Sequence, residues 1–201
     1  MTILITGATG LIGQELVKLL LEKPEFQVKP SQIRLLVRKR AGSPFREKFL
    51  QMVAKKGLDI VWGDLGNIEE VLNFTAVSDP EDSILFHCGA IFNFYQPYDL
   101  IYDINVNGTR RILEGFHKNS LKKLIYVSSV AVYGSLYGKN GSGVTEESPI
   151  ELNQRKSYEL TKSLSENFVW RYYDQHPDKL ITVVRPSGVI GGQGVTSDIF
   201  A

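Results

Sequence analysis

The chain has 201 residues, of which 43% are hydrophobic, enough to bury the core of one domain spanning residues 1–201. Its 23 basic and 22 acidic residues give a formal net charge of +1, so the overall charge predicts no nucleic-acid or membrane partner. The single cysteine, Cys88, excludes an internal disulfide and fits a reducing compartment. No apolar stretch approaches the roughly 20 residues that cross a bilayer, and the first expected strand starts too early for a signal peptide. We therefore expect a cytoplasmic protein.

Short apolar runs alternate with amphipathic patterns along the chain. Runs rich in β-branched residues are expected strands, at residues 3–5, 33–37, 58–61, 84–86, 124–127 and 180–184. The segments between them are expected helices, at residues 13–22, 44–56, 68–74, 104–118 and 158–175. This alternation predicts an α/β fold with a doubly wound parallel sheet, the Rossmann type, covered on both faces. The glycine- and serine-rich stretch 134–149 is expected to be a surface loop near the site.

Three glycines follow the first expected strand at a spacing of three residues and lead into a helix. In a dinucleotide-binding turn, the first glycine makes the tight turn, the second admits a pyrophosphate, and the third lets helix and strand pack. The helix N-terminus would then donate N–H groups to the phosphates. The expected cofactor-binding residues of this turn are Gly7, Thr9, Gly10, Leu11, Ile12 and Gly13. The G-x-x-G-x-x-G spacing is one residue longer than the ordinary pattern, and such a turn can also be purely structural.

Basic residues follow the second expected strand, where a cofactor ribose would lie. The run is Arg38-Lys39-Arg40, and no Asp or Glu occurs between residues 33 and 44. A free ribose 2′-hydroxyl usually takes a carboxylate at this place, whereas a 2′-phosphate takes cations. Arg38 therefore favours NADP(H), with NAD left open, and the alternative is an ordinary solvated charge run.

Tyr158 and Lys162 stand four residues apart, on one face of an expected helix. A lysine beside a tyrosine favours the phenolate and would lower the tyrosine pKa from its ordinary value near ~10. Such a pair can exchange a proton with a carbonyl or hydroxyl group. Ser128 and Ser129 end the fifth expected strand, where one hydroxyl could orient a substrate oxygen. The alternatives are a surface helix pair and serines in an ordinary turn.

Two other chemistries find little support in the sequence. A serine hydrolase would need a G-x-S-x-G elbow, which is absent, and the histidines His87, His117 and His176 follow no recognisable triad order. One cysteine and three scattered histidines also give no metal-binding pattern.

Seven segments in order resemble the extended short-chain dehydrogenase/reductase superfamily, and the similarity covers essentially the whole chain. They are TGATGLIG at the start, GDL at 63–65, HCGA at 87–90, NVNGT at 105–109, YVSSVAVYG at 126–134, YELTK at 158–162 and RPSGVIG at 185–191. Each match is modest by itself, but seven in the family's order make coincidence negligible.

The resemblance implies a role for each matching residue. Ser129 would be the catalytic serine, Tyr158 the acid/base, and Lys162 both a ligand of the nicotinamide ribose and the group that lowers the tyrosine pKa. His87 is expected to be structural, and Asn105 could be structural or catalytic. The remaining cofactor contacts implied are Asp64 and Leu65 beside the adenine, Gly89 and Ala90 along the cofactor, and Pro186 at the nicotinamide.

Two features point to branches of the superfamily. The LVRKR strand ending is similar to NADP-using reductases, and residues 87–109 resemble thioester-reductase and dihydroflavonol-reductase-like enzymes. Phe92, Phe94 and Tyr95 would then form a substrate wall, or else pack in the core. Members continue for roughly another hundred residues after the RPSGVIG strand. The resemblance therefore implies either a truncated C-terminal substrate-binding region or a substrate pocket that is incomplete or completed by another chain.

Three functions follow from these patterns. The first is an NAD(P)(H)-dependent oxidoreductase acting on a carbonyl/alcohol pair of a small-molecule substrate. The second is a nucleotide-sugar epimerase or dehydratase with tightly held NAD. The third is a non-catalytic dinucleotide-binding module, which has no evident need for Tyr158 and Lys162. A homo-oligomer is left open by the sequence.

Overall fold

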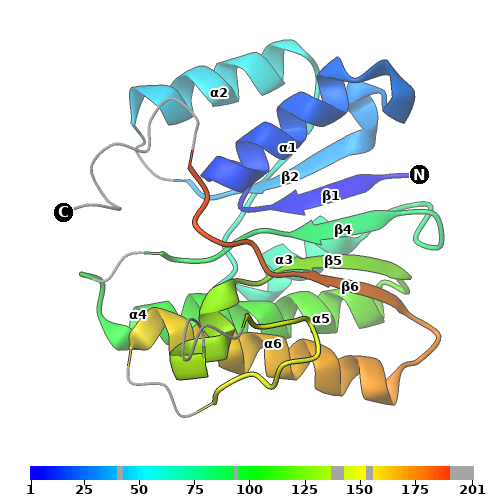
Figure 1. Cartoon of the computed structure of the whole chain (residues 1–201). Helices are drawn as coiled ribbons and strands as arrows, with labels where there is room; N and C mark the ends of the chain where they lie inside the picture. The colour runs from blue at the N-terminus through cyan, green and yellow to red at the C-terminus, as the bar shows by residue number, and fades with distance from the viewer. Residues whose placement is uncertain (40–42, 93–94, 137–142, 153–155, 191–201) are drawn as a thin grey trace.

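The computed structural model describes residues 1–39, 43–92, 95–136, 143–152 and 156–190, and Figure 1 shows its central sheet. All strand pairs are parallel, and the strands lie in the order β3-β2-β1-β4-β5-β6. The strands are β1 (Ile3–Thr6), β2 (Ile33–Val37), β3 (Asp59–Trp62), β4 (Ile84–His87), β5 (Lys123–Val127) and β6 (Leu180–Val184). The chain moves outward from β1 to β3 and then returns to β4. The carboxyl ends of β1 and β4 therefore form the switch point where ligands bind in doubly wound sheets.

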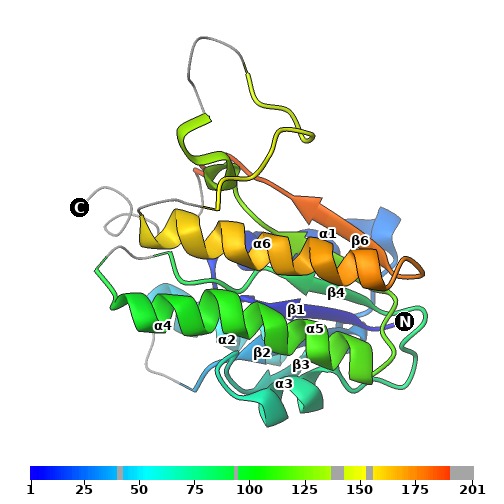
Figure 2. The ribbon, with the colours of Figure 1, turned by 90° about the horizontal axis from the view of Figure 1, so that it is seen from below.

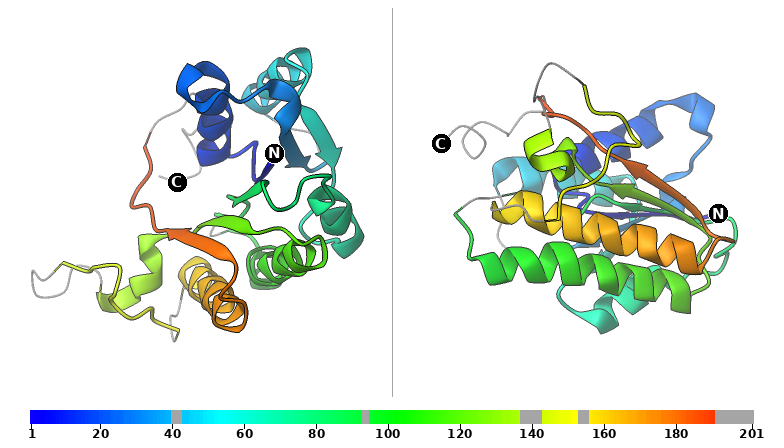
Figure 3. Two further views of the ribbon diagram at one scale, coloured as in Figure 1. Left: turned by 90° about the vertical axis from the view of Figure 1, so that its right-hand side faces the viewer. Right: turned by 60° about the horizontal axis from the view of Figure 1, so that its bottom comes forward.

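Helices cover the sheet in two layers (Figures 1 and 3). α1 (Leu11–Glu22) and α2 (Pro44–Lys55) lie on one side of the sheet. α3 (Ile68–Thr75), α5 (Gly108–Lys118) and α6 (Ser157–Gln175) lie on the other side. Figure 2 shows α5 and α6 running side by side. The predicted doubly wound α/β fold is thus confirmed.

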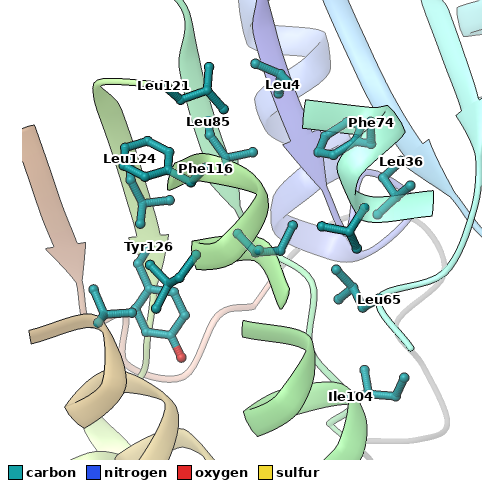
Figure 4. Close-up of a cluster of buried hydrophobic side chains, with 14 residues drawn as sticks. Leu4, Leu36, Leu65, Phe74, Leu85, Ile104, Phe116, Leu121, Leu124 and Tyr126 are labelled. Carbon is teal, nitrogen blue, oxygen red and sulfur yellow. The ribbon is translucent and has the colours of Figure 1, made fainter. Parts of the chain in front are cut away.

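Side-chain alternation along the strands divides the core between the two layers. Ile3 and Ile5 of β1 pack with residues of α1 and α2, including Val17 and Phe49. Leu4, which points to the other face, belongs to the cluster beneath α3, α5 and α6 that Figure 4 shows. This arrangement explains why the strands contain apolar residues at successive positions.

The outermost strand departs from the expectation of cover on both faces. In β6, Ile181 and Val183 pack against the core cluster of α5 and α6. Leu180 and Val184, on the opposite face, are 63% and 44% exposed. Among the described residues, α1 and α2 lie over the other end of the sheet, so this face of β6 has no covering helix.

The helix expected at 104–118 begins earlier and is not uniform. α4 (Tyr98–Tyr102) leads into a π-helix, η3 (Asp103–Asn107), which continues as α5. The start was missed because tyrosines and aspartates after Pro97 carry no clear helical period. Short 3-10 helices, also not predicted, are η1 (Pro24–Phe26), η2 (Pro30–Gln32) and η4 (Val130–Leu136). The expected loop 134–149 therefore begins inside η4, and its residues 137–142 lie outside the described part of the chain.

Candidate functional site

The turn after β1 is shaped by two glycines that have no room for a side chain. Gly7 has a φ of +66°, and a Cβ on it would lie 2.7 Å from the carbonyl carbon of Cys88. A Cβ on Gly13 would lie 2.3 Å from the Gly7 carbonyl oxygen. The first contact sets the turn against the end of β4, and the second sets α1 against the turn. Both distances are too short for real carbon atoms, so packing alone accounts for these two glycines.

Gly10 differs from them because its surroundings are open. It is exposed, and among the described residues a Cβ there would meet only the Gly7 carbonyl oxygen, at 3.2 Å. Gly10 is the N-cap of α1, which has neither a side-chain cap nor an acidic residue in its first turn. The first N–H groups of a helix lack partners within it and attract anions. An uncapped N-terminus behind a bare glycine fits the pyrophosphate of a dinucleotide.

The other predicted residues of this turn lie at the same helix start. Leu11 and Ile12 form the first turn of α1 and are half-buried. Thr9 precedes Gly10, and its carbonyl oxygen accepts a hydrogen bond of 2.9 Å from the Gln14 side chain. This bond ties the turn to the second turn of the helix.

A hollow of about 310 Å³ lies at the carboxyl ends of β2 and β3. The Arg38 Nε atom lies 3.8 Å from the Asp64 Oδ2 atom, so the structure brings these two predicted residues together. Trp62 and Glu70 also line the hollow, and the sequence did not single them out, although Trp62 directly precedes the GDL segment. The lining residues are Arg38, Lys39, Trp62, Gly63, Asp64 and Glu70. Arg40, the third residue of the basic run, lies outside the described residues.

Leu65 and Gly89 were both expected beside the cofactor, and they lie against each other. Leu65 is buried in the core, and a Cβ on Gly89 would lie 2.8 Å from its Cδ1 atom. The Leu65 side chain is therefore a packing group in this structure. The Gly89 N–H donates to the Thr6 hydroxyl at 3.1 Å, and Ala90 after it is exposed.

His87, at the end of β4, has the structural setting that the sequence analysis expected. Its Nδ1 atom lies 2.7 Å from the Thr6 hydroxyl, and its Nε2 atom lies 3.1 Å from the Thr109 hydroxyl. Burial, with a smaller contribution from the nearby Lys162 charge, lowers the His87 pKa to about 3. A neutral imidazole with both nitrogens engaged is not poised as a base.

Asn105 in the π-helix η3 also uses its whole side chain for internal bonds. Its Oδ1 accepts from the Ile91 N–H at 2.7 Å, and its Nδ2 donates to the Ile91 carbonyl oxygen and to the Thr161 hydroxyl. Asn105 thus joins the segment after β4 to α6. Of the two roles considered, these contacts favour the structural one.

The two serines at the end of β5 turn out to have separate partners. Ser128 is buried and donates to the Glu166 carboxylate at 2.5 Å. Ser129 instead lies near enough to the Tyr158 hydroxyl to lower the Tyr158 pKa. The Tyr158 ring also meets Phe92 edge-on, with ring centroids 4.6 Å apart. Ser128 is thus engaged by Glu166, whereas Ser129 is the serine that acts on Tyr158.

Lys162 is buried below this pair. Its Nζ atom donates to the Tyr126 hydroxyl at 2.9 Å and to the Val127 carbonyl oxygen at 2.8 Å. Both acceptors are on β5, so the ammonium is fixed against the strand end that carries Ser129. Tyr126 belongs to the YVSSVAVYG segment, but the resemblance implies no role for it. Figure 4 shows its ring in the core cluster.

The direction of the Tyr158 pKa shift corrects the sequence-based expectation. Burial raises the Tyr158 pKa above its ordinary value, while the Lys162 charge and the nearby Ser129 lower it by less. Burial also lowers the Lys162 pKa, and Tyr158 and Glu166 partly restore it. The lysine acts in the expected direction, but desolvation outweighs it. In this structure Tyr158 holds its proton at neutral pH.

Other predicted residues lie at the margins of this site. Pro186 follows β6, and its carbonyl oxygen accepts from the Val130 N–H at 3.1 Å, close to the β5 end. Phe92 is 44% exposed and Tyr95 is 75% exposed, so neither is a core residue. Phe94 lies outside the described residues.

Three features that the sequence did not link to catalysis are the Cys88 thiol, metal ligands and membrane-spanning helices. Burial raises the pKa of the Cys88 thiol to about 12, as befits an inert cysteine. The described residues hold no group of three or more His, Cys, Asp or Glu side chains placed to bind a metal ion. In the same part of the chain, no helix combines the length and apolar character needed to span a membrane.

Known proteins share both the sequence and the fold. The chain is 34% identical over 47% of its length to an N-acetyl-alpha-D-glucosaminyl-diphospho-ditrans,octacis-undecaprenol 4-epimerase of Escherichia coli O157:H7, covering 27% of that protein. It is 31% identical over 94% of its length to UDP-glucose 4-epimerase 2 of Oryza sativa subsp. japonica, covering 47% of that protein. The chain thus spans less than half the length of these relatives.

A solved structure supports the same relationship. The terminal R domain from the myxalamid PKS-NRPS biosynthetic pathway superposes with a TM-score of 0.74 and 28% identity, over 94% of this chain and 49% of that one. The model of the NAD dependent epimerase/dehydratase family matches residues 3–199. The resemblance inferred from the seven segments is thereby confirmed, and the chain belongs to the NAD dependent epimerase/dehydratase family.

Proposed function

We propose that this chain is the catalytic Rossmann domain of an NAD(P)(H)-dependent oxidoreductase that moves hydride between a nicotinamide and a carbonyl/alcohol substrate. The observation that carries the proposal is the Lys162 ammonium, which is buried one helical turn from Tyr158 and donates to the Val127 carbonyl oxygen, two residues before Ser129. This group lies at the carboxyl edge of the same sheet as the Gly10 turn.

Each side chain has a role that its surroundings support. Tyr158 keeps its proton at neutral pH because burial raises its pKa, so it can donate to a carbonyl oxygen as that oxygen gains negative charge. Ser129 would hold the same oxygen, and Lys162 would stabilise the phenolate that forms and bind the nicotinamide ribose. A bound nicotinamide would supply or accept the hydride.

NADP(H) is the proposed cofactor. Arg38 and Lys39 line the hollow at the end of β2, where the ribose 2′ position falls in dinucleotide-binding folds. A 2′-phosphate there would replace Asp64 as the partner of Arg38, and a guanidinium can donate two parallel hydrogen bonds to it. Asp64 keeps the hollow compatible with NAD, so the preference rests on the cations.

The proposed substrate is a small molecule with an apolar group beside its carbonyl. Phe92 contacts the Tyr158 ring edge-on and remains 44% exposed, which leaves apolar surface next to the reacting hydroxyl. Tyr95, 75% exposed, follows in the same segment.

The balanced charge and the inert Cys88 support a cytoplasmic protein, and self-association is left to direct measurement.

The test is the reduction of a panel of aldehydes by NADPH. The loss of the reduced-nicotinamide absorbance measures the rate of the reaction. Turnover of apolar aldehydes that is abolished in Tyr158→Phe would support the proposal. Tight NADPH binding without turnover of any carbonyl would favour the dinucleotide-binding module instead. Binding of neither nicotinamide cofactor would contradict the proposed function.

An epimerase or dehydratase that recycles bound NAD is the second candidate. The relatives named as epimerases and the Asp64 carboxylate in the hollow favour it. Such an enzyme would retain NAD through purification without added cofactor. Release of NAD from the denatured protein, together with conversion of a nucleotide sugar, would select this function over the first.

A further inference from the structure

A buried carboxylate lies one helical turn beyond the Tyr158 and Lys162 pair. Glu166 on α6 is 0% exposed, and its spacing of four residues from Lys162 continues the same ridge of the helix. Buried carboxylates are rare unless their charge is paired. The contacts of Glu166 therefore show which segments of the chain this part of α6 is bonded to.

Both oxygens of the Glu166 carboxylate are engaged. The Ser128 hydroxyl donates to Oε2 at 2.5 Å, and the Trp170 indole donates to Oε1 at 2.9 Å. The Arg185 guanidinium donates to both oxygens, from Nε at 2.9 Å and 3.2 Å and from a terminal nitrogen to Oε1. The carboxylate thus joins α6 to residues that follow β5 and β6.

Arg185 extends this connection to η4 and to the loop at Glu146. It donates to the Tyr133 hydroxyl at 2.6 Å and to the Glu146 carbonyl oxygen at 2.8 Å. The Ser128 N–H also donates to the Val184 carbonyl oxygen at 2.7 Å, beside Arg185 in the chain. One ion pair therefore connects two strand ends, the 3-10 helix η4 and the loop at Glu146.

We propose that the Glu166–Arg185 ion pair is a positioning clamp, acting through Ser128 on the strand end that carries Ser129 and through α6 on Tyr158 and Lys162. The inference rests on the proposed function and adds two positioning residues to it. A buried ion pair contributes little net stability compared with apolar packing. Its specific geometry, however, fixes the strand end and the helix in one relative position.

The electrostatics around Lys162 act in the same direction. The titratable groups facing its ammonium are Tyr158 and Glu166 from α6, Tyr126 from β5, and His87 and Cys88 from the end of β4. In the described residues Lys162 has no ion-pair partner within 4.0 Å, and the Tyr126 hydroxyl and the Val127 carbonyl oxygen that accept from it are neutral. The Glu166 charge one turn away helps to keep the buried lysine protonated.

Two probes separate positioning from simple loss of stability. NADP⁺ spans the whole site, whereas 2′,5′-ADP reaches only the hollow at Arg38 and the turn at Gly10. Ser128→Ala removes the link to the strand end and leaves the ion pair intact. We expect Ser128→Ala to weaken NADP⁺ binding about fivefold and to leave 2′,5′-ADP binding unchanged, as measured by isothermal titration.

Glu166→Gln, which also removes the charge, should weaken NADP⁺ binding by about tenfold or more, again without affecting 2′,5′-ADP. Because it leaves Arg185 unpaired, this variant can fail to fold, and Ser128→Ala then decides the question. Thr75→Val is the matched control, since Thr75 has a buried hydroxyl that hydrogen-bonds the Val71 carbonyl oxygen on α3. It should lower thermal stability and keep the ratio of the two affinities.

An unchanged affinity ratio in Ser128→Ala, with NADP⁺ still bound by the unsubstituted protein, overturns the clamp and leaves the proposed function standing. Failure of the unsubstituted protein to bind NADP⁺ overturns both.

Discussion

The turn after β1 and the cluster around Tyr158 meet at one edge of the sheet, but they are built by opposite means. The turn depends on missing side chains, because Gly7 and Gly13 leave no space for a Cβ and Gly10 leaves an open approach to the helix N-terminus. The cluster depends on buried polar side chains, with Lys162 held by two hydrogen bonds from β5. We infer that substitutions in the turn change phosphate binding or folding, whereas substitution of Tyr158 in the cluster changes proton transfer.

The largest effect that would sharpen this contrast is expected at Tyr158. Tyr158→Phe removes the transferable proton and keeps the ring, so turnover should fall on the order of 10²–10⁴-fold with cofactor affinity unchanged. Steady-state kinetics and NADPH titration measure the two quantities. Tyr173→Phe, at an exposed tyrosine of the same helix, serves as control. Normal turnover in Tyr158→Phe would remove the acid/base role.

A second large effect should come from the turn, and it concerns stability. Gly13→Ala introduces a Cβ 2.3 Å from the Gly7 carbonyl oxygen, so the helix must shift, at a cost of about 1–3 kcal/mol in the free energy of unfolding. Gly10→Ala is the matched control, because its Cβ would meet only one atom at 3.2 Å. Chemical denaturation measures both. Equal stability of the two variants would mean that helix and turn do not pack as described.

Cofactor choice tests the outer end of the turn region. Arg38→Glu places a carboxylate in the hollow at β2, where it repels a 2′-phosphate and can accept from a ribose hydroxyl. NADP⁺ affinity should fall about tenfold, or about 1.4 kcal/mol, while NAD⁺ affinity is unchanged or improved. Lys118→Glu makes the same charge change away from the hollow. Equal losses for both cofactors would contradict the role of Arg38.

The smallest effect concerns His87, which lies between the two regions. The folded protein keeps His87 neutral until about pH 3, whereas the unfolded chain takes up the proton near the ordinary value of 6.5. The unfolded state therefore binds more protons at acid pH, and this contribution is present above pH 6.5 and lost as the pH falls. We expect the free energy of unfolding to drop by about 1 kcal/mol between pH ~7 and ~5.5.

Substitution of His87 isolates that contribution from the carboxylates. In His87→Gln the difference between the two pH values should shrink by the same amount, as measured by urea denaturation. A variant with the same pH dependence as the unsubstituted protein would show that His87 takes up a proton in the folded state.

The sequence predicted the parts of the fold and site that depend on local pattern. Residues 33–37 have the bounds expected from their apolar content, because a buried parallel strand needs apolar residues on both faces. Residues 180–184 also have the expected bounds, although only one face of that strand is covered. The exposed face of β6 escaped prediction, since Leu180 and Val184 look like buried residues when the neighbouring helices are unknown.

Contacts between distant segments could not be predicted in the same way. The anchoring of Lys162 on Tyr126, 36 residues away, and the pairing of Glu166 with Ser128 arise only when α6 packs on β5. The same burial reverses the expected Tyr158 pKa shift, because a sequence shows a neighbouring charge but not the water that folding removes.

The most direct test of the central claim is the affinity of the unsubstituted protein and of Gly10→Val for NADP⁺, measured by isothermal titration. The branched side chain would stand at the approach to the helix N-terminus, where a Cβ on residue 10 lies 3.2 Å from the Gly7 carbonyl oxygen. We predict that the unsubstituted protein binds NADP⁺ and that Gly10→Val, which remains folded, loses at least about tenfold in affinity, or about 1.4 kcal/mol. Equal affinities for NADP⁺ in the two proteins would contradict it.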